Sequence, residues 1–513
     1  MINDFLKNNG IDCLLVNSTN EFLVEYNTLE ENSRYHLTGF SGSTGDALIS
    51  PEGIFLFVDG RYHIQADNEV DHSKISVVKL QTGQTFLEEI TKKVPKGAVV
   101  GVVARKNSQK RVEEFEKYFK VKLLDIDPFE KSFSRPKLCN EKIELKYSGL
   151  TSEEKIKLLQ DKLQSEEAFL FTNLEEVSYL FNLRDFSRPY AANILGKAFV
   201  SKDKACLFTP ENMSELDSIL CGFEGKIFVD KASINARDYS LIRNKVQEAE
   251  SPLKLMKSVK NDAEISHYKD AFRRTDAALY AIREYIENSG NISEYDIANQ
   301  LEKEFLRFGA RSLSFKSIVA KDKNSALAHY SKSSKDEIIK EGSLVLIDCG
   351  AYYEGGLATD ITRVFVKGQP SDLQKTVYTT VLKAFLHAFN FSGKDFCGYD
   401  QDLLARKIFD ENKIAGFEFN HGLGHGIGIS VHEAPPNLSK NSIAKTKITE
   451  NMCFTIEPGL YNKEHFGVRL ENSCYYKDGK INSFVNMCYE DKLIDYGMLT
   501  QQEKTWLGNF EVK

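Results

Sequence analysis

Residues 343–366, SLVLIDCGAYYEGGLATDITRVFV, contain two apolar runs joined by a glycine-rich turn, and this pattern predicts a β-hairpin. Asp348 and Asp360 lie six residues on either side of Glu354, so the hairpin can bring their side chains face to face. Opposed carboxylates repel each other, and buried acids must be paired or coordinated. The pattern therefore predicts a cation, most simply a metal ion, between them. The alternative is that one aspartate caps a turn while the other is solvated.

A second acidic pair occurs in the strand–turn–strand pattern NMCFTIEPGLYNKEHFGVRLENS, residues 451–473. Glu457 closes the first predicted strand, and Arg469 and Glu471 share one face of the second. Together with the two aspartates and one histidine, these glutamates give a set of Asp, Asp, His, Glu and Glu. Such carboxylate-rich sites suit two hard or borderline divalent ions such as Mn²⁺, Co²⁺ or Zn²⁺.

The histidine comes from HGLGHGIGISVHEAP, residues 421–435. His421 and His425 are four residues apart, which on a helix would place two metal ligands on one face. Four glycines alternate through the stretch, however, and glycine at that density disfavours a helix. We therefore expect an extended strand on which one histidine is enough, because the carboxylates fill the remaining metal positions.

Composition narrows the class of protein. With 513 residues the chain should form two or three domains, and its 42% hydrophobic and 27% charged residues suit a globular fold. A net charge of −7 does not favour a nucleic-acid binder. Nine scattered cysteines without a CxxC pair, no signal-peptide pattern and no long apolar run lead us to expect a cytoplasmic protein without a membrane segment.

Strand-like and helix-like segments alternate in the first half of the chain, which predicts α/β domains over residues 1–126 and 127–255. A long amphipathic helix, DAEISHYKDAFRRTDAALYAIREYIEN, then opens a third region. From about residue 310, β-rich runs with tight turns are interrupted by helices near 371–390 and 401–412. Residues 256–513 should therefore form an α+β domain whose strands carry the acidic residues.

The order of DCGAYYEGGLATDITR, HGLGHGIGISVHEAP, TIEPGLY and GVRLENS resembles the dinuclear-metal "pita-bread" peptidases, which include methionine aminopeptidase, prolidase and aminopeptidase P. RYHLTGFSGSTGDALIS and FVDGRYHIQA are similar to the N-terminal domain of aminopeptidase P and creatinase. EEVSYLFNLRD and DKLIDYGMLTQQEKTWLGNF resemble the second domain and the closing segment of the long, three-domain cytosolic aminopeptidase P. The resemblance implies two creatinase-like α/β domains followed by a pita-bread catalytic domain.

The same resemblance implies a ligand set. Asp348 would chelate one metal, Asp360 and Glu471 would bridge the two ions, and His425 would bind the other metal together with Glu457. Mn²⁺ is the expected ion, with Co²⁺ or Zn²⁺ as alternatives. The implied reaction is hydrolysis of the N-terminal Xaa-Pro bond by a hydroxide held between the metals.

Other residues receive roles from the resemblance. Glu457 would carry the proton to the leaving nitrogen. His329 and His432 match positions that bind substrate and stabilise the oxyanion, and His421 matches a histidine that lines the substrate pocket. Arg469 would orient Glu471. The expected partners are peptides with proline at the second position and a second copy of the chain in a homodimer.

Two departures from the family pattern bear on these expectations. Asp348 and Asp360 are twelve residues apart rather than eleven, and the extra residue should fall in the Gly355–Gly356 turn. His425 and His432 are seven apart, as in prolidase-like members. Prolidase, which cleaves Xaa-Pro dipeptides, is therefore the main alternative. A creatinase-type amidinohydrolase and a non-catalytic pita-bread binding module fit less well, because all five ligand types are present.

Overall fold

The computed structural model describes residues 2–25, 27–60, 62–81, 84–133, 137–328, 330, 332–391 and 396–513, with Ile64 described by its backbone alone. Contacts divide the chain into two compact units. Unit 1 contains residues 1–138, 152–181 and 194–252, and unit 2 contains residues 139–151, 182–193 and 253–513. The three-domain division expected from the sequence stays a prediction.

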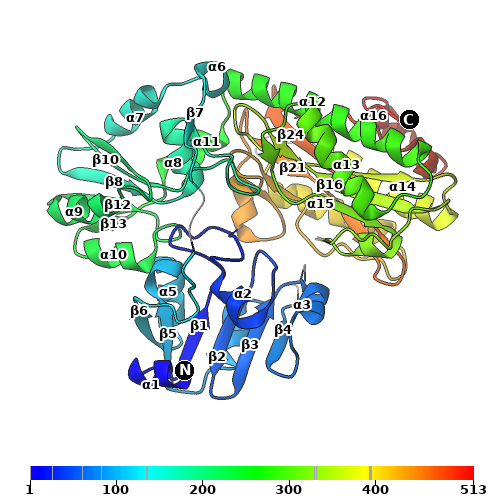
Figure 1. The fold of residues 1–513 in the computed structure, drawn as a ribbon. Coiled ribbons are helices and arrows are strands. Elements are labelled where there is room, and N and C mark those ends of the chain that lie inside the picture. Colours follow the sequence, from blue (N-terminus) through cyan, green and yellow to red (C-terminus); the bar gives the residue numbers. More distant parts are fainter. Residues whose placement is uncertain are drawn as a thin grey trace. The chain divides into compact units, whose positions relative to one another are not determined.

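The first part of unit 1 is a six-stranded mixed sheet in the order β4-β3-β2-β1-β5-β6 (Figure 1). Its central strand β1 is antiparallel to β2 and parallel to β5. Apolar residues cover both faces of the sheet, as expected for the continuous apolar runs in its strands. The strands are β1 Cys13–Val16, β2 Asp46–Ser50, β3 Gly53–Val58, β4 Ile75–Lys79, β5 Val99–Val103 and β6 Lys120–Leu124. The helices are α1 Ile2–Asn8, α2 Ser33–Thr38, α3 His63–Glu69, α4 Phe86–Thr91 and α5 Gln109–Glu116.

The second part of unit 1 is a five-stranded sheet in the order β11-β10-β8-β12-β13. Strand β8 is antiparallel to β10 and parallel to β12, so its pairing repeats that of β1 in the first sheet. This agrees with the similar size and pattern of the two α/β stretches in the sequence. The strands are β8 Glu167–Phe171, β10 Lys197–Ser201, β11 Ala205–Phe208, β12 Lys226–Val229 and β13 Val246–Glu248, and the helices are α7 Ser152–Gln160, α8 Leu174–Phe181, α9 Ser214–Gly222 and α10 Ala236–Ile242.

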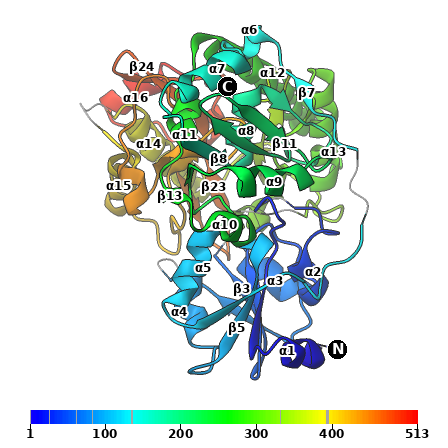
Figure 2. The same cartoon turned by 90° about the vertical axis from the view of Figure 1, so that its left-hand side faces the viewer.

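Unit 2 combines long helices with two larger antiparallel sheets. The predicted amphipathic helix is α12, Asp262–Asn288, which begins at a capping box formed by Asn261 and Glu264. Helix α12 packs against α13, and α14 lies beside α15 (Figure 2). The other helices are α6 Leu145–Ser148, α11 Pro252–Ser258, α13 Glu294–Arg307, α14 Asp372–Phe389, α15 Gly398–Glu411 and α16 Gln501–Leu507.

The sheets of unit 2 have the orders β15-β16-β18 and β20-β19-β21-β24-β25, with the short pairs β14-β17, β22-β23 and β7-β9 beside them. One apolar core lies between these strands and helices α14 and α15. The strands are β7 Glu141–Lys142, β9 Leu183–Arg184, β14 Ser312–Leu313, β15 Ile318–Lys321, β16 Leu344–Cys349, β17 Ala351–Tyr352, β18 Ile361–Val366, β19 Gly424–Gly426, β20 Glu433–Leu438, β21 Cys453–Ile456, β22 Gly459–Tyr461, β23 Gly467–Arg469, β24 Asn472–Lys477 and β25 Lys480–Ser483.

Among the helices in the described part of the chain, none is both long enough and apolar enough to cross a bilayer.

Candidate metal centre

The predicted hairpin places both aspartates on one face. Asp348 lies opposite Thr362, and the pairing continues without a bulge to Tyr352 opposite Ala358. Because directly opposed residues and residues two apart on a strand share a face, Asp360 points to the same side as Thr362 and Asp348. The loop that remains is residues 353–357, so the extra residue in the Asp348–Asp360 spacing lies in the turn and does not reverse either side chain.

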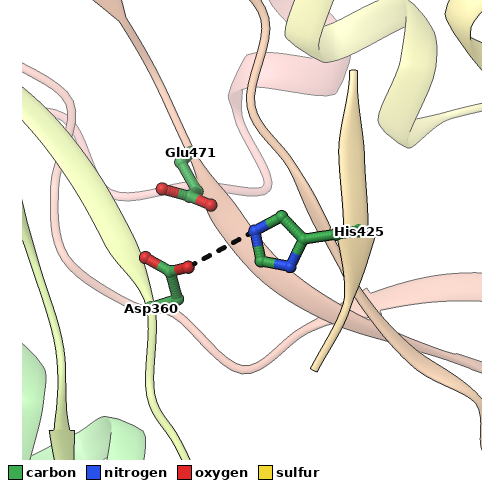
Figure 3. Close-up of side chains that lie close together, drawn as sticks. All are labelled: Asp360, His425 and Glu471. Atoms are coloured by element: carbon green, nitrogen blue, oxygen red, sulfur yellow. Dashed lines mark ion pairs between the residues drawn. The ribbon is translucent and has the colours of Figure 1, made fainter. Parts of the chain in front are cut away.

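Three side chains meet in front of this hairpin: Asp360 directly before β18, His425 on β19 and Glu471 directly before β24. Asp360, His425 and Glu471 each offer a ligand atom, and these atoms lie within 4.8 Å of one another (Figure 3). Asp360 Oδ2 is 3.6 Å from His425 Nε2. The ring of His425 donates from Nδ1 to the carbonyl oxygen of Gly426 at 3.0 Å, since that oxygen can only accept. Because burial lowers the pKa of His425 and so favours the neutral ring, the lone pair lies on Nε2, the nitrogen that faces the carboxylates.

The other two predicted ligands complete the group. Glu457 follows β21, and its Oε1 is 3.6 Å from His425 Nε2. Asp348 Oδ2 accepts a hydrogen bond from Arg469 Nη2 at 2.5 Å, and Arg469 Nε is 3.9 Å from Glu457 Oε2. Asp348 and Glu457 therefore lie beside one buried arginine, and Glu457 also faces His425.

The electrostatics of the group favour cations. Burial raises the pKa of Asp360 and of Glu471 well above the ordinary range, and the neighbouring carboxylates add to the rise. Burial also raises the pKa of Glu457 to about 8, although Arg469 opposes the shift. Asp348 Oδ1, Asp360 Oδ1 and Glu471 Oε1 are buried without a hydrogen-bond partner among the described residues. Unpaired buried carboxylate oxygens beside an unprotonated imidazole nitrogen fit divalent metal ions.

A hydrogen-bonded chain connects the ligands to the predicted pocket histidine. Arg469 Nη1 donates to Tyr461 Oη at 2.8 Å. Tyr461 Oη donates in turn to His421 Nε2 at 2.8 Å, because His421 Nδ1 is already the donor to the carbonyl oxygen of Gly422 at 2.7 Å. Burial lowers the pKa of His421 to about 3, so the ring is neutral, and the two hydrogen bonds place its proton on Nδ1. The sequence analysis did not single out Tyr461, although it lies in the quoted TIEPGLY motif.

Thr362 is a second residue that the sequence analysis missed. Its hydroxyl donates to Glu471 Oε2 at 2.7 Å and accepts from Arg469 Nε at 3.2 Å. Arg469, which was expected to orient Glu471, reaches it through this hydroxyl and contacts Asp348 directly. The available signal was the position of Thr362 two residues after Asp360, on the same strand face.

Two of the three histidines expected on the substrate side, His421 and His432, belong to the described residues. His432 is exposed, and its ring lies edge-on to that of His425 with 4.5 Å between the ring centroids. His421 is hydrogen-bonded through Nε2 to Tyr461 Oη. His329 lies outside the described residues, so its predicted role is not addressed by the structure.

Comparisons with known proteins agree with this picture. Residues 266–478 match Metallopeptidase family M24, and residues 2–132 and 134–222 each match the Creatinase/Prolidase N-terminal domain. A Schizosaccharomyces pombe protein named as an uncharacterised peptidase is 30% identical, over 99% of this chain and 94% of the relative. Xaa-Pro aminopeptidase 1 of Dictyostelium discoideum is 29% identical, over 99% of this chain and 90% of the relative.

The fold has a similar counterpart among solved structures. The X-prolyl aminopeptidase of Caenorhabditis elegans, described as a cytosolic enzyme with a di-nuclear active site, superposes with a TM-score of 0.89 at 23% identity, over 97% of this chain and 90% of that chain. Creatinase-like N-terminal domains followed by a carboxylate-rich site on an α+β domain define a metallopeptidase. The chain belongs to metallopeptidase family M24. The fold class and the family resemblance expected from the sequence are confirmed.

Proposed function

We propose that this protein is a metal-dependent aminopeptidase that releases the N-terminal residue from peptides whose second residue is proline. The meeting of Asp360, His425 and Glu471, with unpartnered carboxylate oxygens between them, is the observation that carries the proposal. The full-length similarity to a relative named Xaa-Pro aminopeptidase supports the substrate class.

Five residues would hold two divalent ions, namely Asp348, Asp360, His425, Glu457 and Glu471. When bound, such ions supply a nucleophile at neutral pH and polarise the scissile carbonyl. Mn²⁺ is our choice of working ion, with Co²⁺ or Zn²⁺ as alternatives, because the ligand set is rich in carboxylates and includes one imidazole.

Glu457 is our candidate for the residue that moves a proton. Its side chain is 19% exposed, whereas that of Asp360 is 6% exposed, so Glu457 is the more open to an incoming peptide. We assign to it the transfer of a proton, through a carboxylate oxygen, to the nitrogen that leaves. Arg469 Nε, 3.9 Å from Glu457 Oε2, would favour the charged form after the proton has left.

Proline explains why a dedicated site is needed. The bond before proline is a tertiary amide without an N–H, and the ring fixes the backbone shape. We assign His432, with His329, to binding the substrate and to stabilising the oxyanion. His421, kept neutral by burial and hydrogen-bonded to Tyr461 Oη, would line the substrate pocket. Arg469 holds Asp348 directly, and through Thr362 it holds Glu471.

The decisive assay compares two peptides. The protein is stripped with a chelator, Mn²⁺, Co²⁺ or Zn²⁺ is restored, and an Arg-Pro-Pro tripeptide is offered beside a Gly-Pro dipeptide. We expect metal-dependent release of arginine from the tripeptide. Cleavage of the dipeptide alone would identify a prolidase, the alternative favoured by the His425–His432 spacing. If neither peptide is cleaved with any of the metals, the peptidase proposal is refuted, and a non-catalytic binding module becomes the remaining interpretation.

A substitution tests the role of Glu457 in the same assay. Glu457→Gln should keep the bound metal, measured by atomic absorption, and should lower kcat by about 10²- to 10⁴-fold, as for loss of a general acid–base group. Glu464→Gln, which changes an exposed glutamate of the same unit, is the matched control and should leave kcat unchanged. Near-normal turnover of Glu457→Gln would refute the assignment.

We also propose a cytoplasmic location and a homodimer. The scattered cysteines support a reducing compartment. Light scattering on the purified protein would test the dimer, because a mass near that of one chain at micromolar concentration would exclude it. Fractionation of the source cells would test the location.

A further inference from the structure

Glu433, the residue after His432, is a buried carboxylate held between two buried lysines. Its Oε2 is 3.1 Å from Lys257 Nζ and 3.4 Å from Lys260 Nζ. The three side chains are only 3%, 4% and 2% exposed, so the pairs are shielded from solvent. Although burial opposes ionisation, the two lysines lower the pKa of Glu433 to about 2, and the carboxylate is charged at any working pH.

The second oxygen of Glu433 holds the segment that carries His432. We call residues 427–432 the histidine loop. Glu433 Oε1 accepts the backbone N–H of Ile429 at 2.8 Å. The carboxylate lies so far inside the loop that a Cβ on Gly428 would be 2.2 Å from Glu433 Oε2, which explains why glycine stands there. The loop therefore folds around this one side chain.

The histidine loop is also tied to the metal-bearing hairpin. The carbonyl oxygen of Gly428 accepts the N–H of Ala358 at 2.7 Å, immediately after the hairpin loop 353–357. The N–H of Ile427 donates to the carbonyl oxygen of Cys453 on β21, the strand that ends before Glu457. A shift of the loop would therefore change the position of His432 relative to the metal ligands.

The two lysines are themselves fixed. Lys257 lies on α11, and Lys260 precedes Asn261, the N-cap of α12. The backbone N–H of Lys260 donates to the carbonyl oxygen of Asn451 at 3.0 Å, and Val259 pairs with Met452. The backbone at Lys260 is therefore anchored to the residues just before β21. Because both ammonium groups lie on one oxygen of Glu433, they set the direction in which the other oxygen faces the loop.

We propose that Glu433, clamped by Lys257 and Lys260, is a positioning residue that fixes the histidine loop and so presents His432 to the substrate. The inference rests on the proposed function only in the role of His432. An apolar cluster could fill the same space with less desolvation cost, but it could not hold the Ile429 N–H in one direction.

The test uses Glu433→Gln in the metal-loaded full-length protein. We expect kcat/KM for Arg-Pro-Pro to fall by about 10- to 100-fold, as for other residues that orient catalytic groups, while the metal content stays the same. Lys257→Met should act in the same direction, and Lys257→Arg, which keeps the charge, should recover most of the activity. Lys383→Met removes another buried lysine–glutamate pair of unit 2, with Glu503 at 3.0 Å, and is the control that should leave kcat/KM unchanged.

A double-mutant cycle separates positioning from a general structural defect. If Glu433 acts through His432, Glu433→Gln should have almost no further effect in a His432→Ala background. Equal losses in both backgrounds, or no loss in the single variant, would overturn the proposal. If the Glu433→Gln protein does not fold, the same cycle is run with Lys257→Met.

A measurement without turnover keeps this proposal distinct from the proposed function. Hydrogen–deuterium exchange of the peptide that covers residues 427–432 should be faster in Glu433→Gln than in the wild type and unchanged in Lys383→Met. If the wild type cleaves no Xaa-Pro peptide but exchange in the loop of the variant becomes faster as expected, the proposed function is refuted. The proposed positioning of the loop by Glu433 is then still supported. Unchanged exchange in Glu433→Gln would refute the positioning role of Glu433, whatever the activity of the variant.

Discussion

Hydrogen-bond direction decides the state of individual side chains around the metal centre. Each donor from Arg469 forces the next group to accept, so Tyr461 has only its own proton to give, and His421 must receive it on Nε2. The same reasoning leaves the lone pair of His425 on Nε2, facing Asp360 and Glu457. Burial lowers the pKa of both histidines and keeps them neutral, while the backbone carbonyls of Gly422 and Gly426 decide which ring nitrogen carries the proton.

A buried carboxylate outside the metal centre allows a test of how burial changes stability with pH. Asp276 on α12 is 4% exposed, its Oδ2 accepts the N–H of Asn486 at 2.8 Å, and burial raises its pKa to about 6. The folded-state pKa exceeds the ordinary aspartate value of 3.8, so the protonated group favours folding, and this contribution is lost as pH rises from about 4 through 6. Asp276→Asn should therefore stabilise the protein by up to about 3 kcal/mol at pH 8, with a gain that shrinks towards pH 4.

Urea unfolding at pH 5, 6.5 and 8 would measure this pH dependence. Asp410→Asn, at an exposed position of α15, is the control and should change the free energy of unfolding by less than about 0.5 kcal/mol at each pH. A gain for Asp276→Asn that is the same at all three values would contradict the assigned ionisation.

At the scale of elements, the hairpin was predictable because its pattern and its register are local. Two apolar runs and a glycine turn fix the strands, and the period of two then decides that Asp348 and Asp360 share a face. Tyr461 and Thr362 were missed because their roles depend on partners on other strands. The pairing of Lys257 with Glu433 joins residues far apart in the chain, and no spacing rule predicts such a contact.

The hairpin loop makes a prediction at the same scale. Gly356 has a φ of +62°, and a Cβ there would lie 2.6 Å from the side chain of Arg184, whose Nε donates to the Gly356 carbonyl oxygen at 3.1 Å. Gly479, in the β24–β25 turn, has a φ of +74° with nothing within 4 Å. Gly479→Ala should cost about 1 kcal/mol for the left-handed backbone alone. Gly356→Ala should cost at least about 1 kcal/mol more and should weaken metal binding, because the loop joins the two aspartate strands.

Chemical denaturation and metal titration of the two alanine variants would check this expectation. Equal losses of stability, with equal metal affinity, would show that the loop between the aspartates tolerates a side chain as readily as an ordinary turn.

For the molecule as a whole, the unit that carries the metal centre is not one continuous stretch of chain. Residues 139–151 and 182–193 belong to unit 2, where β7 pairs with β9. Asn261, the N-cap of α12, donates from Nδ2 to the Ser148 carbonyl oxygen at 2.8 Å, and Asn193 Nδ2 donates to Ser430 Oγ at 3.2 Å. The sequence could not indicate this, because both segments lie within an α/β pattern that favours assignment to the preceding domain.

A fragment that begins at Leu253 should therefore be less than a complete catalytic unit. It would lose Arg184 from the hairpin loop, Ser148 from the cap of α12 and the ring of Tyr147, which lies 5.0 Å from that of the buried His267. Removing a buried hydrogen-bonded arginine and exposing apolar contacts should lower the free energy of unfolding by several kcal/mol, which is a large part of the usual total of about 5–15 kcal/mol.

Thermal melts of residues 253–513 and of the full chain, each with and without Mn²⁺, would measure this difference. Arg184→Ala in the full chain is the companion variant and should give a smaller loss in the same direction. A fragment that melts at the same temperature and gains as much from Mn²⁺ as the full chain would show that the two segments are dispensable.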